Sequence, residues 1–248
     1  MKRATIVFAA LLALSAALAG CDADPVVTAS PAKAAGSPGA PVLGPRDALA
    51  ARAAAAKDLR QVAFYVWKSS GRPDRTVAVI RADDGSWRVD IPSAVLGGAV
   101  DVTIVYAGKA LYECVLPSGG CLRVSGALPK TADPLVQHVF SDWLGILTDR
   151  QQPLAVSVAQ PLPGAAGECF AVESSATSLK LRVDPGIYCY ESDGTLTAAR
   201  LSFGTMMLAG RPGSAPPTLI LPGAIMPGQP LPLAAPPPPS GSASPVPH

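Results

Sequence analysis

Few side chains in this 248-residue chain have the types and spacing that catalysis requires. The histidines are His138 and His248, and only His138 lies in the region that we expect to fold. Asp142 follows it at the (i, i+4) spacing that places two side chains together on a helix. Such a pair could bind a metal or form half of a catalytic dyad, but it is more often a surface contact. No GxSxG motif supplies a nucleophilic serine.

Paired carboxylates and glycine pairs are also explained without catalysis. Asp83 and Asp84 precede Gly85 in a predicted turn, where aspartate is common, and no second acidic pair suggests a glycosidase. Gly97-Gly98 and Gly119-Gly120 lack the lysine and helix start of a phosphate-binding loop. The sequence therefore predicts no enzyme, no cofactor and no metal.

The N-terminus has the pattern of an export signal. Met1-Lys2-Arg3 precedes an apolar run from Ala4 to Ala19 that is too short for a comfortable membrane span. Leu18-Ala19-Gly20-Cys21 resembles the bacterial lipobox, which implies cleavage after residue 20 and a diacylglycerol on Cys21. The alternative is an ordinary signal peptide with an accidental cysteine. We expect a lipoprotein held by acyl chains, such as palmitate, on the extracytoplasmic face of the cell membrane.

Four cysteines remain beyond Cys21, which in an exported chain argues for two disulfide bonds. Three pairings are possible, and we favour local pairing because Cys114 and Cys121 flank a turn while Cys169 and Cys189 lie in neighbouring strand-like runs. A zinc site is the rival interpretation, but no CxxC spacing occurs.

Composition divides the chain into four parts. The signal peptide (1–20) is followed by a tether rich in Ala, Pro, Ser and Gly (21–45), which we expect to be disordered, by one domain (46–210) and by a proline-rich tail (211–248). Most of the tail should be extended or disordered, although the leucines near residues 219–221 and 231–233 could lie against the domain. The net charge is +2, with scattered cations, so no nucleic-acid partner is predicted.

Hydrophobic periodicity predicts the elements of the domain. Residues 46–60 favour a helix, and Asp133 with Pro134 begins a second, long one that carries a wide apolar stripe to Leu147. Asp84-Gly85 and Asp193-Gly194 mark hairpins. Strand-like runs occupy 62–67, 76–80, 86–91, 102–106, 111–115, 121–124, 154–158, 169–172, 179–183, 187–190, 196–203 and 206–208. We expect an α+β domain whose strongly curved antiparallel sheet, a half-open barrel, wraps around the long apolar helix.

Two stretches, Asp84 to Pro92 and Gly186 to Thr197, make the domain similar to the LolA and LppX type of lipoprotein carrier. The resemblance covers about residues 46 to 209 and implies an apolar cavity that holds a lipid, an acyl chain or a lipidated partner. The alternatives are that the lining residues are ordinary core and that the protein is an envelope scaffold or protein-interaction lipoprotein with a solid core. The candidate lining residues are Phe64, Val66, Val79, Trp87, Val89, Phe140, Trp143 and Leu147.

Overall fold

A computed structural model describes residues 43–117, 119–176 and 182–237. The predicted signal peptide, Cys21 and nearly all of the tether lie outside the described residues, as does most of the strand-like run 179–183. Among the described residues, no helix is long and apolar enough to cross a membrane.

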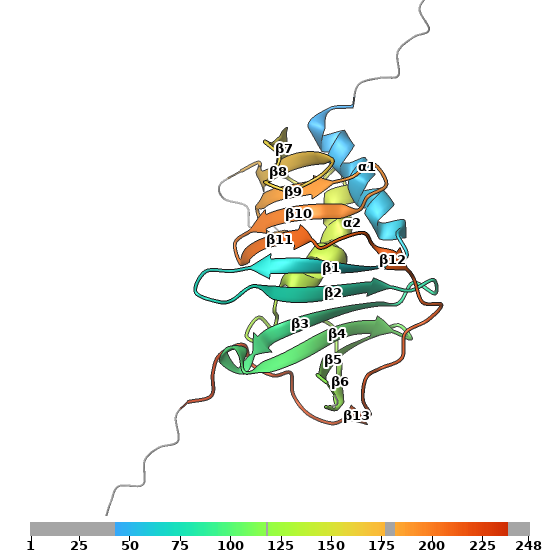
Figure 1. The fold of residues 1–248 in the computed structure, drawn as a ribbon, viewed down its shortest axis with the longest axis vertical. Helices are drawn as coiled ribbons and strands as arrows, with labels where there is room; N and C mark the ends of the chain where they lie inside the picture. The colour runs from blue at the N-terminus through green and yellow to red at the C-terminus, as the bar shows by residue number, and fades with distance from the viewer. Residues whose placement is uncertain (1–42, 118, 177–181, 238–248) are drawn as a thin grey trace, which may run out of the picture. The chain divides into compact units, whose positions relative to one another are not determined.

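One 13-stranded sheet forms the body of the domain (Figure 1). Two antiparallel meanders meet where β1 pairs with β11, and the order is β13-β6-β5-β4-β3-β2-β1-β11-β10-β9-β8-β7, with β12 beside β1. Within the described residues only β13 pairs in parallel, with β6. The strands are β1 (Gln61–Lys68), β2 (Arg75–Arg81), β3 (Trp87–Val95), β4 (Val100–Ala107), β5 (Ala110–Val115), β6 (Cys121–Val124), β7 (Leu154–Val158), β8 (Glu168–Ser174), β9 (Gly186–Tyr190), β10 (Leu196–Leu201), β11 (Gly204–Leu208), β12 (Gly213–Ser214) and β13 (Ile225–Met226).

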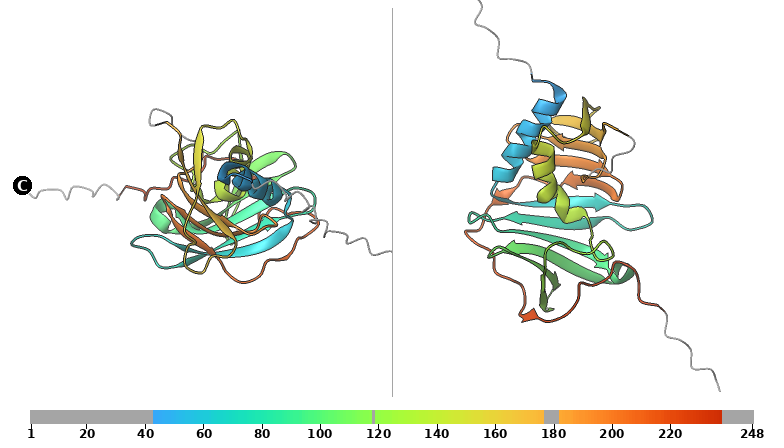
Figure 2. Two further views of the ribbon diagram at one scale, coloured as in Figure 1. Left: turned by 90° about the horizontal axis from the view of Figure 1, so that it is seen from above. Right: turned by 180° about the vertical axis from the view of Figure 1, so that it is seen from behind.

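Two helices pack on one face of this sheet, which we call the helical face (Figure 2). The alanine-rich segment forms α1 (Pro45–Asp58), with proline in its first turn, and buries Leu49 and Ala53. It contacts α2 (Asp142–Thr148), which buries Trp143 and Leu147. The main hydrophobic core lies between these helices and the sheet.

The prediction of one long apolar helix is wrong. Residues 136–140 form a short 3-10 helix, η2 (Val136–Phe140), and the chain breaks at Ser141 before α2 begins. The imidazole of His138 contacts both Asp133 and Asp142. In a continuous α-helix Asp133, five residues before His138, would lie about 140° around the axis from it. A regular helix therefore cannot make both contacts, and the backbone bonds here are those of tight turns, from His138 to Leu135 and from Ser141 to His138.

The prediction of a strongly curved half-barrel is also wrong, because the sheet is open and not strongly curled. Its two edge strands are β7 and β13, which stand at opposite ends of the strand order and do not pair with each other. The two short helices lie against one face of the sheet and are not enclosed by it (Figure 2). The observed class is a mainly β domain with one open sheet and two short helices.

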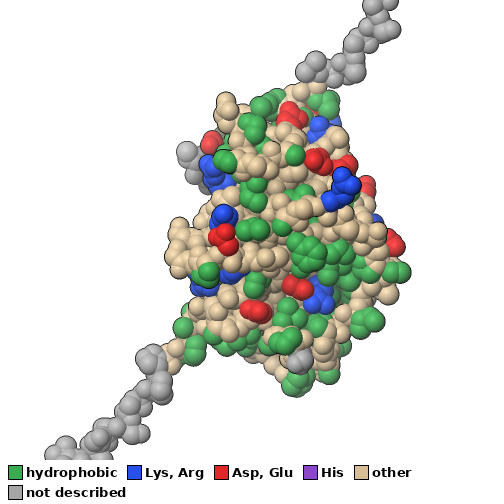
Figure 3. Space-filling view, viewed as in Figure 1, with side chains coloured by type: hydrophobic (Ala, Val, Ile, Leu, Met, Phe, Trp, Pro, Cys, Tyr) green, Lys and Arg blue, Asp and Glu red, His purple; other side chains and the backbone are tan. Residues whose placement is uncertain are grey.

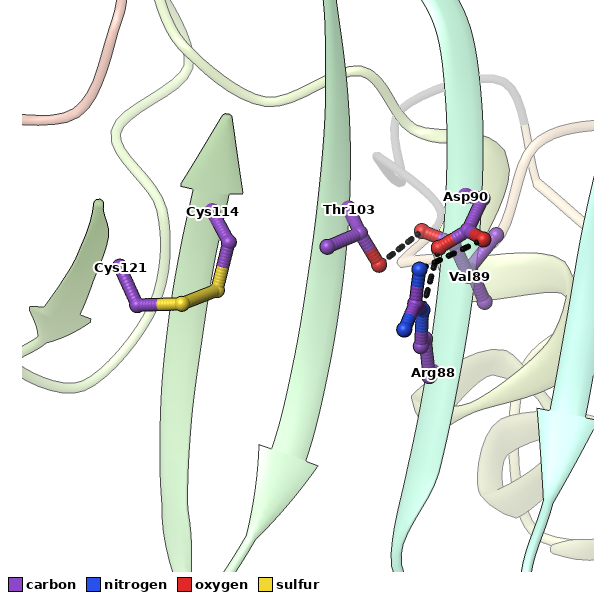
Figure 4. Close-up of a disulfide and its surroundings, with 6 residues drawn as sticks. All are labelled: Arg88, Val89, Asp90, Thr103, Cys114 and Cys121. Carbon is purple, nitrogen blue, oxygen red and sulfur yellow. Dashed lines mark hydrogen bonds and ion pairs between the residues drawn. A yellow bond between two sulfur atoms is a disulfide. The ribbon is translucent and has the colours of Figure 1, made fainter. Parts of the chain in front are cut away.

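The opposite face of the sheet, here called the outer face, is the one toward the viewer in Figure 3. It carries polar contacts such as the pair Arg88–Asp90, with Nε and Oδ1 2.6 Å apart, and the hydrogen bond that Thr103 donates to the carbonyl of Val89 (Figure 4). Side chains alternate between faces along each strand, so Arg88, Asp90 and Thr103 lie on the face opposite the core.

Both disulfides lie on the outer face, and the predicted pairing is confirmed. Cys114–Cys121 joins opposed residues of β5 and β6 (Figure 4), and Cys169–Cys189 joins opposed residues of β8 and β9. Each bridge is packed beneath a covering segment. Leu162 covers the second bridge, while the first lies under leucines of the C-terminal tail.

The described part of that tail, residues 211–237, follows the sheet in an extended conformation, and we call it the C-terminal strap. It pairs with β1 through β12, packs Leu219 and Leu221 near Cys114–Cys121, and pairs with β6 through β13. Leu231 and Leu233 then pack against the main core. The strap therefore wraps around the β6 edge of the sheet from the outer to the helical face.

Removal of the disulfides by paired Cys→Ser substitution should lower the free energy of unfolding by unequal amounts. The bridges span sequence separations of 7 and 20 residues, for which loop-closure entropy gives about 2 and about 3 kcal/mol. Chemical denaturation of the two double variants measures this. The prediction is contradicted if loss of Cys114–Cys121 is the more damaging change.

Candidate functional site

The helices leave part of the helical face uncovered, and a cavity of about 530 Å³ lies there. It opens where α1 ends and where η2 passes into α2, over strands β2 to β5. The loop after β6 closes another side. The lining residues are Lys57, Asp58, Arg81, Trp87, Ile104, Tyr106, Leu111, Gly126, Ala127, Leu128, Gln137, His138, Ser141 and Asp142.

The wall formed by the sheet is apolar because strand alternation brings large side chains together. Trp87, Tyr106 and Leu111 are directly opposed residues of three neighbouring strands. The rings of Trp87 and Tyr106 stack with centroids 6.1 Å apart. Ile104 and Leu128 continue the same surface. Cross-strand rows of this kind stabilise the sheet and also present a continuous hydrophobic surface.

The wall formed by the helix ends is polar, and its groups are mostly engaged within the protein. Arg81 donates to the carbonyl of Phe140 at 2.5 Å and to that of Lys57, in the last turn of α1, at 2.9 Å. Burial lowers the pKa of Arg81 from its usual value. Gln137 is 2% exposed, and its carboxamide oxygen has no hydrogen-bond partner among the described residues.

His138 is held between two carboxylates in an arrangement that we call the histidine clamp. Its Nδ1 lies 2.5 Å from Asp142 Oδ1, its Nε2 lies 2.8 Å from Asp133 Oδ2, and its ring stacks on Trp143. Burial alone would lower the pKa of His138, but the hydrogen bonds and charges of both aspartates outweigh it and raise the pKa to about 9. The imidazole is thus a cation at neutral pH, and the clamp holds the cavity wall in place rather than supplying a base.

A second cavity, of about 720 Å³, shares His138 and Asp142 with the first. Its lining combines cations such as Lys130 and Arg182 with Trp143. The clamp therefore contributes to the walls of both cavities.

Glu113 is a buried carboxyl on the same face of the sheet. It is opposed to Ile104, lies two residues from Leu111, and is 4% exposed. Its Oε1 accepts a hydrogen bond from the backbone N–H of Leu231 in the strap, at 3.2 Å. Burial raises the pKa of Glu113 to about 7, against the smaller lowering effect of that hydrogen bond.

The predicted lining residues fall into three groups: those that line a cavity or small space, those buried in the core, and those on the outer face. Trp87 lines the 530 Å³ cavity and Trp143 the second one, while Val79 and Phe140 line a small space of about 20 Å³. Val89 and Leu147 are fully buried core residues.

Phe64 and Val66 lie on the outer face, and Phe64 is 47% exposed. The alternate residues Ala63, Tyr65 and Trp67 face the core instead, since a shift of one residue along a strand exchanges its faces. Sequence reasoning missed Ile104, Tyr106, Leu111 and Leu128. Two of them could have been found by pairing the predicted strands that follow the hairpin at Asp84-Gly85. That pairing places Tyr106 opposite Trp87, and Leu111 opposite Tyr106.

The histidine clamp should be visible in an NMR titration, in which His138 has a midpoint near pH 9. A histidine whose pKa is raised by folding stabilises the folded state. This stabilisation is complete below pH 6.5, the pKa of the unfolded state, and it is lost as the pH rises to about 9, the pKa of the folded state. Asp142→Asn should lower the midpoint of His138. An unchanged midpoint in the variant, or one near 6.5 in the wild type, would refute the clamp.

Replacement of Glu113 tests its buried carboxyl. An acid whose pKa is raised by folding lowers the free energy of unfolding as the pH rises from about 4.5, the pKa of the unfolded state, to about 7, the pKa of the folded state. Above pH 7 this loss of stability stays constant. Glu113→Gln should thus be more stable than wild type at pH 8 by up to about 3 kcal/mol and equally stable at pH 4. Chemical denaturation at both pH values measures the difference in free energy of unfolding between the variant and the wild type. A difference that is the same at pH 4 and pH 8 would contradict the explanation.

Comparison with known proteins does not assign the chain to a family. No family model matches the chain, and no curated protein matches it significantly. Within the described ranges, no group of three or more His, Cys, Asp or Glu side chains could hold a metal ion.

Proposed function

We propose that this chain is an exported, lipid-anchored protein that binds an apolar ligand, such as a single acyl chain, in the 530 Å³ cavity. The observation that carries the proposal is the uncovered row formed by Trp87, Tyr106 and Leu111. The sequence resemblance to lipoprotein carriers suggests the same class of ligand, although the half-barrel that it implied is not found.

The size and chemistry of the cavity support this function. Small-molecule sites are typically about 300 to 1,000 Å³ and combine apolar walls with a few placed polar groups. Here the apolar groups lie on the sheet, and the polar groups of Arg81, Gln137 and His138 lie on the helix side. Arg81 and His138 are already hydrogen-bonded within the protein, so an uncharged chain fits the cavity better than a strongly ionic ligand.

The proposed location rests on the N-terminal sequence. Acylation of Cys21 would place the domain at the extracytoplasmic face of the membrane, joined by a tether of small residues and proline. A domain held there is close to a supply of acyl chains. Two disulfides agree with an oxidising compartment.

A second candidate function is that of an envelope scaffold. It is favoured by the strap, on which Ile220, Ile225 and Met226 are large, exposed hydrophobic residues that a protein partner could cover. Most of the helical face is also packed core. A scaffold would not need the cavity to be filled by a ligand.

Titration with a fluorescent fatty acid separates the two candidates. The purified chain, stripped of bound lipid, should take up one probe saturably. Leu111→Trp fills the cavity and should weaken binding about tenfold, which corresponds to excluding roughly two methylenes. Phe64→Trp enlarges an exposed residue of the outer face and serves as the matched control, with unchanged affinity. Absence of saturable binding would leave the scaffold function standing.

A further inference from the structure

Outside β12 and β13, most of the backbone hydrogen bonds that hold the strap run in one direction; the exception is the N–H of Leu233, which donates to the carbonyl of Thr131 at 2.8 Å. Five N–H groups of the domain donate to strap carbonyls, and three of those carbonyls belong to prolines. Because proline has a carbonyl but no N–H, a row of donors suits a proline-rich chain. The donor and acceptor pairs are Asp83 to Pro216 (3.0 Å), Asp84 to Pro217 (3.2 Å), Leu96 to Pro232 (2.8 Å), Gly97 to Leu233 (2.8 Å) and Cys121 to Ala224 (2.8 Å).

The strap lies on the surface rather than within the core. None of its residues, 211–237, is buried; each is exposed or only partly covered. Its contacts are concentrated at two leucine pairs, Leu219 with Leu221 and Leu231 with Leu233. A few partly buried anchors on an extended backbone are typical of a bound peptide.

Glycines on both the domain and the strap let the two backbones approach closely. A Cβ on Gly97 would lie 2.8 Å from the Cβ of Ala235, and a Cβ on Gly223 would collide with the carbonyl oxygen of Gly119. Side chains add two specific contacts: Thr218 donates to Asp84 at 2.7 Å, and the N–H of Leu231 donates to Glu113. The contact surface thus matches the strap at the level of both backbone and side chains.

We propose that the surface running from Asp83 around β6 to Gly97 is a binding track for an extended, proline-rich peptide. Residues 211–237 occupy this track in cis, and the same segment of a second copy of the chain can replace them in trans. This inference does not rest on the ligand-binding function, because the track and the 530 Å³ cavity are separate. Because the strap is covalently joined to the domain, its effective concentration at the track is high. Exchange therefore becomes measurable only after the chain is cut between the domain and the strap.

Exchange can be tested in the full chain with a protease site inserted between Gly210 and Arg211, both exposed. The chain folds intact, is then cleaved, and is mixed with a dye-labelled synthetic peptide of residues 211–237. We expect the labelled peptide to bind saturably with a stoichiometry of one and to release the cleaved tail, while circular dichroism remains unchanged. The uncleaved chain should show at least tenfold weaker uptake.

A peptide carrying Leu231→Ser and Leu233→Ser, and a peptide of the same composition in scrambled order, are the matched controls. Both should bind at least tenfold more weakly. The proposal is overturned if the cleaved tail cannot be displaced by excess peptide, if the domain unfolds when the tail leaves, or if the tail leaves and the labelled peptide does not bind. The first two results would make the strap an integral part of the fold, and the third would exclude a track.

Discussion

The width of the sheet is the constraint on which the other features depend. The continuous path of twelve strands, at about 4.8 Å from one to the next, is roughly 50 Å across, whereas the 14-residue α1 is only about 21 Å long. Two short helices cannot cover the apolar side chains of such a face. The loop after β6 and the leucines of the strap cover more of it, and the 530 Å³ cavity is one part that stays open.

The histidine clamp determines where the helical cover ends. Because Asp133 and Asp142 both contact His138, the chain turns at Ser141 and α2 has only seven residues. His138 and Asp142 also form part of the cavity wall, and the two aspartates keep His138 a cation at neutral pH.

Local patterns in the sequence predict much of this fold. The hairpins at Asp84-Gly85 and Asp193-Gly194, the helix of residues 45–58 and both disulfide pairs are determined by neighbouring residues, and each of them is found. The broken helix could not be predicted in this way, because its apolar stripe suits a continuous helix and the competing contact joins residues five apart. Curvature of the sheet also depends on what packs against it, which periodicity does not show.

The site was predicted only in part for a similar reason. Trp87 was identified from its own strand, but its partners Tyr106 and Leu111 come from the next two strands and require the register. Phe64 was predicted to line the cavity, but alternation along β1 places it on the outer face. Long-range register therefore limits prediction of the cavity more than residue type does.

A crystal structure of the chain soaked with a bromine-labelled fatty acid tests the central claim most directly. An uncovered apolar face predicts an anomalous bromine peak in contact with Trp87, Ile104 or Leu111, at the ends of α1 and η2. A peak located elsewhere, or a face on which side chains fill the space and no bromine is bound, would contradict the claim that the helices leave a ligand site open.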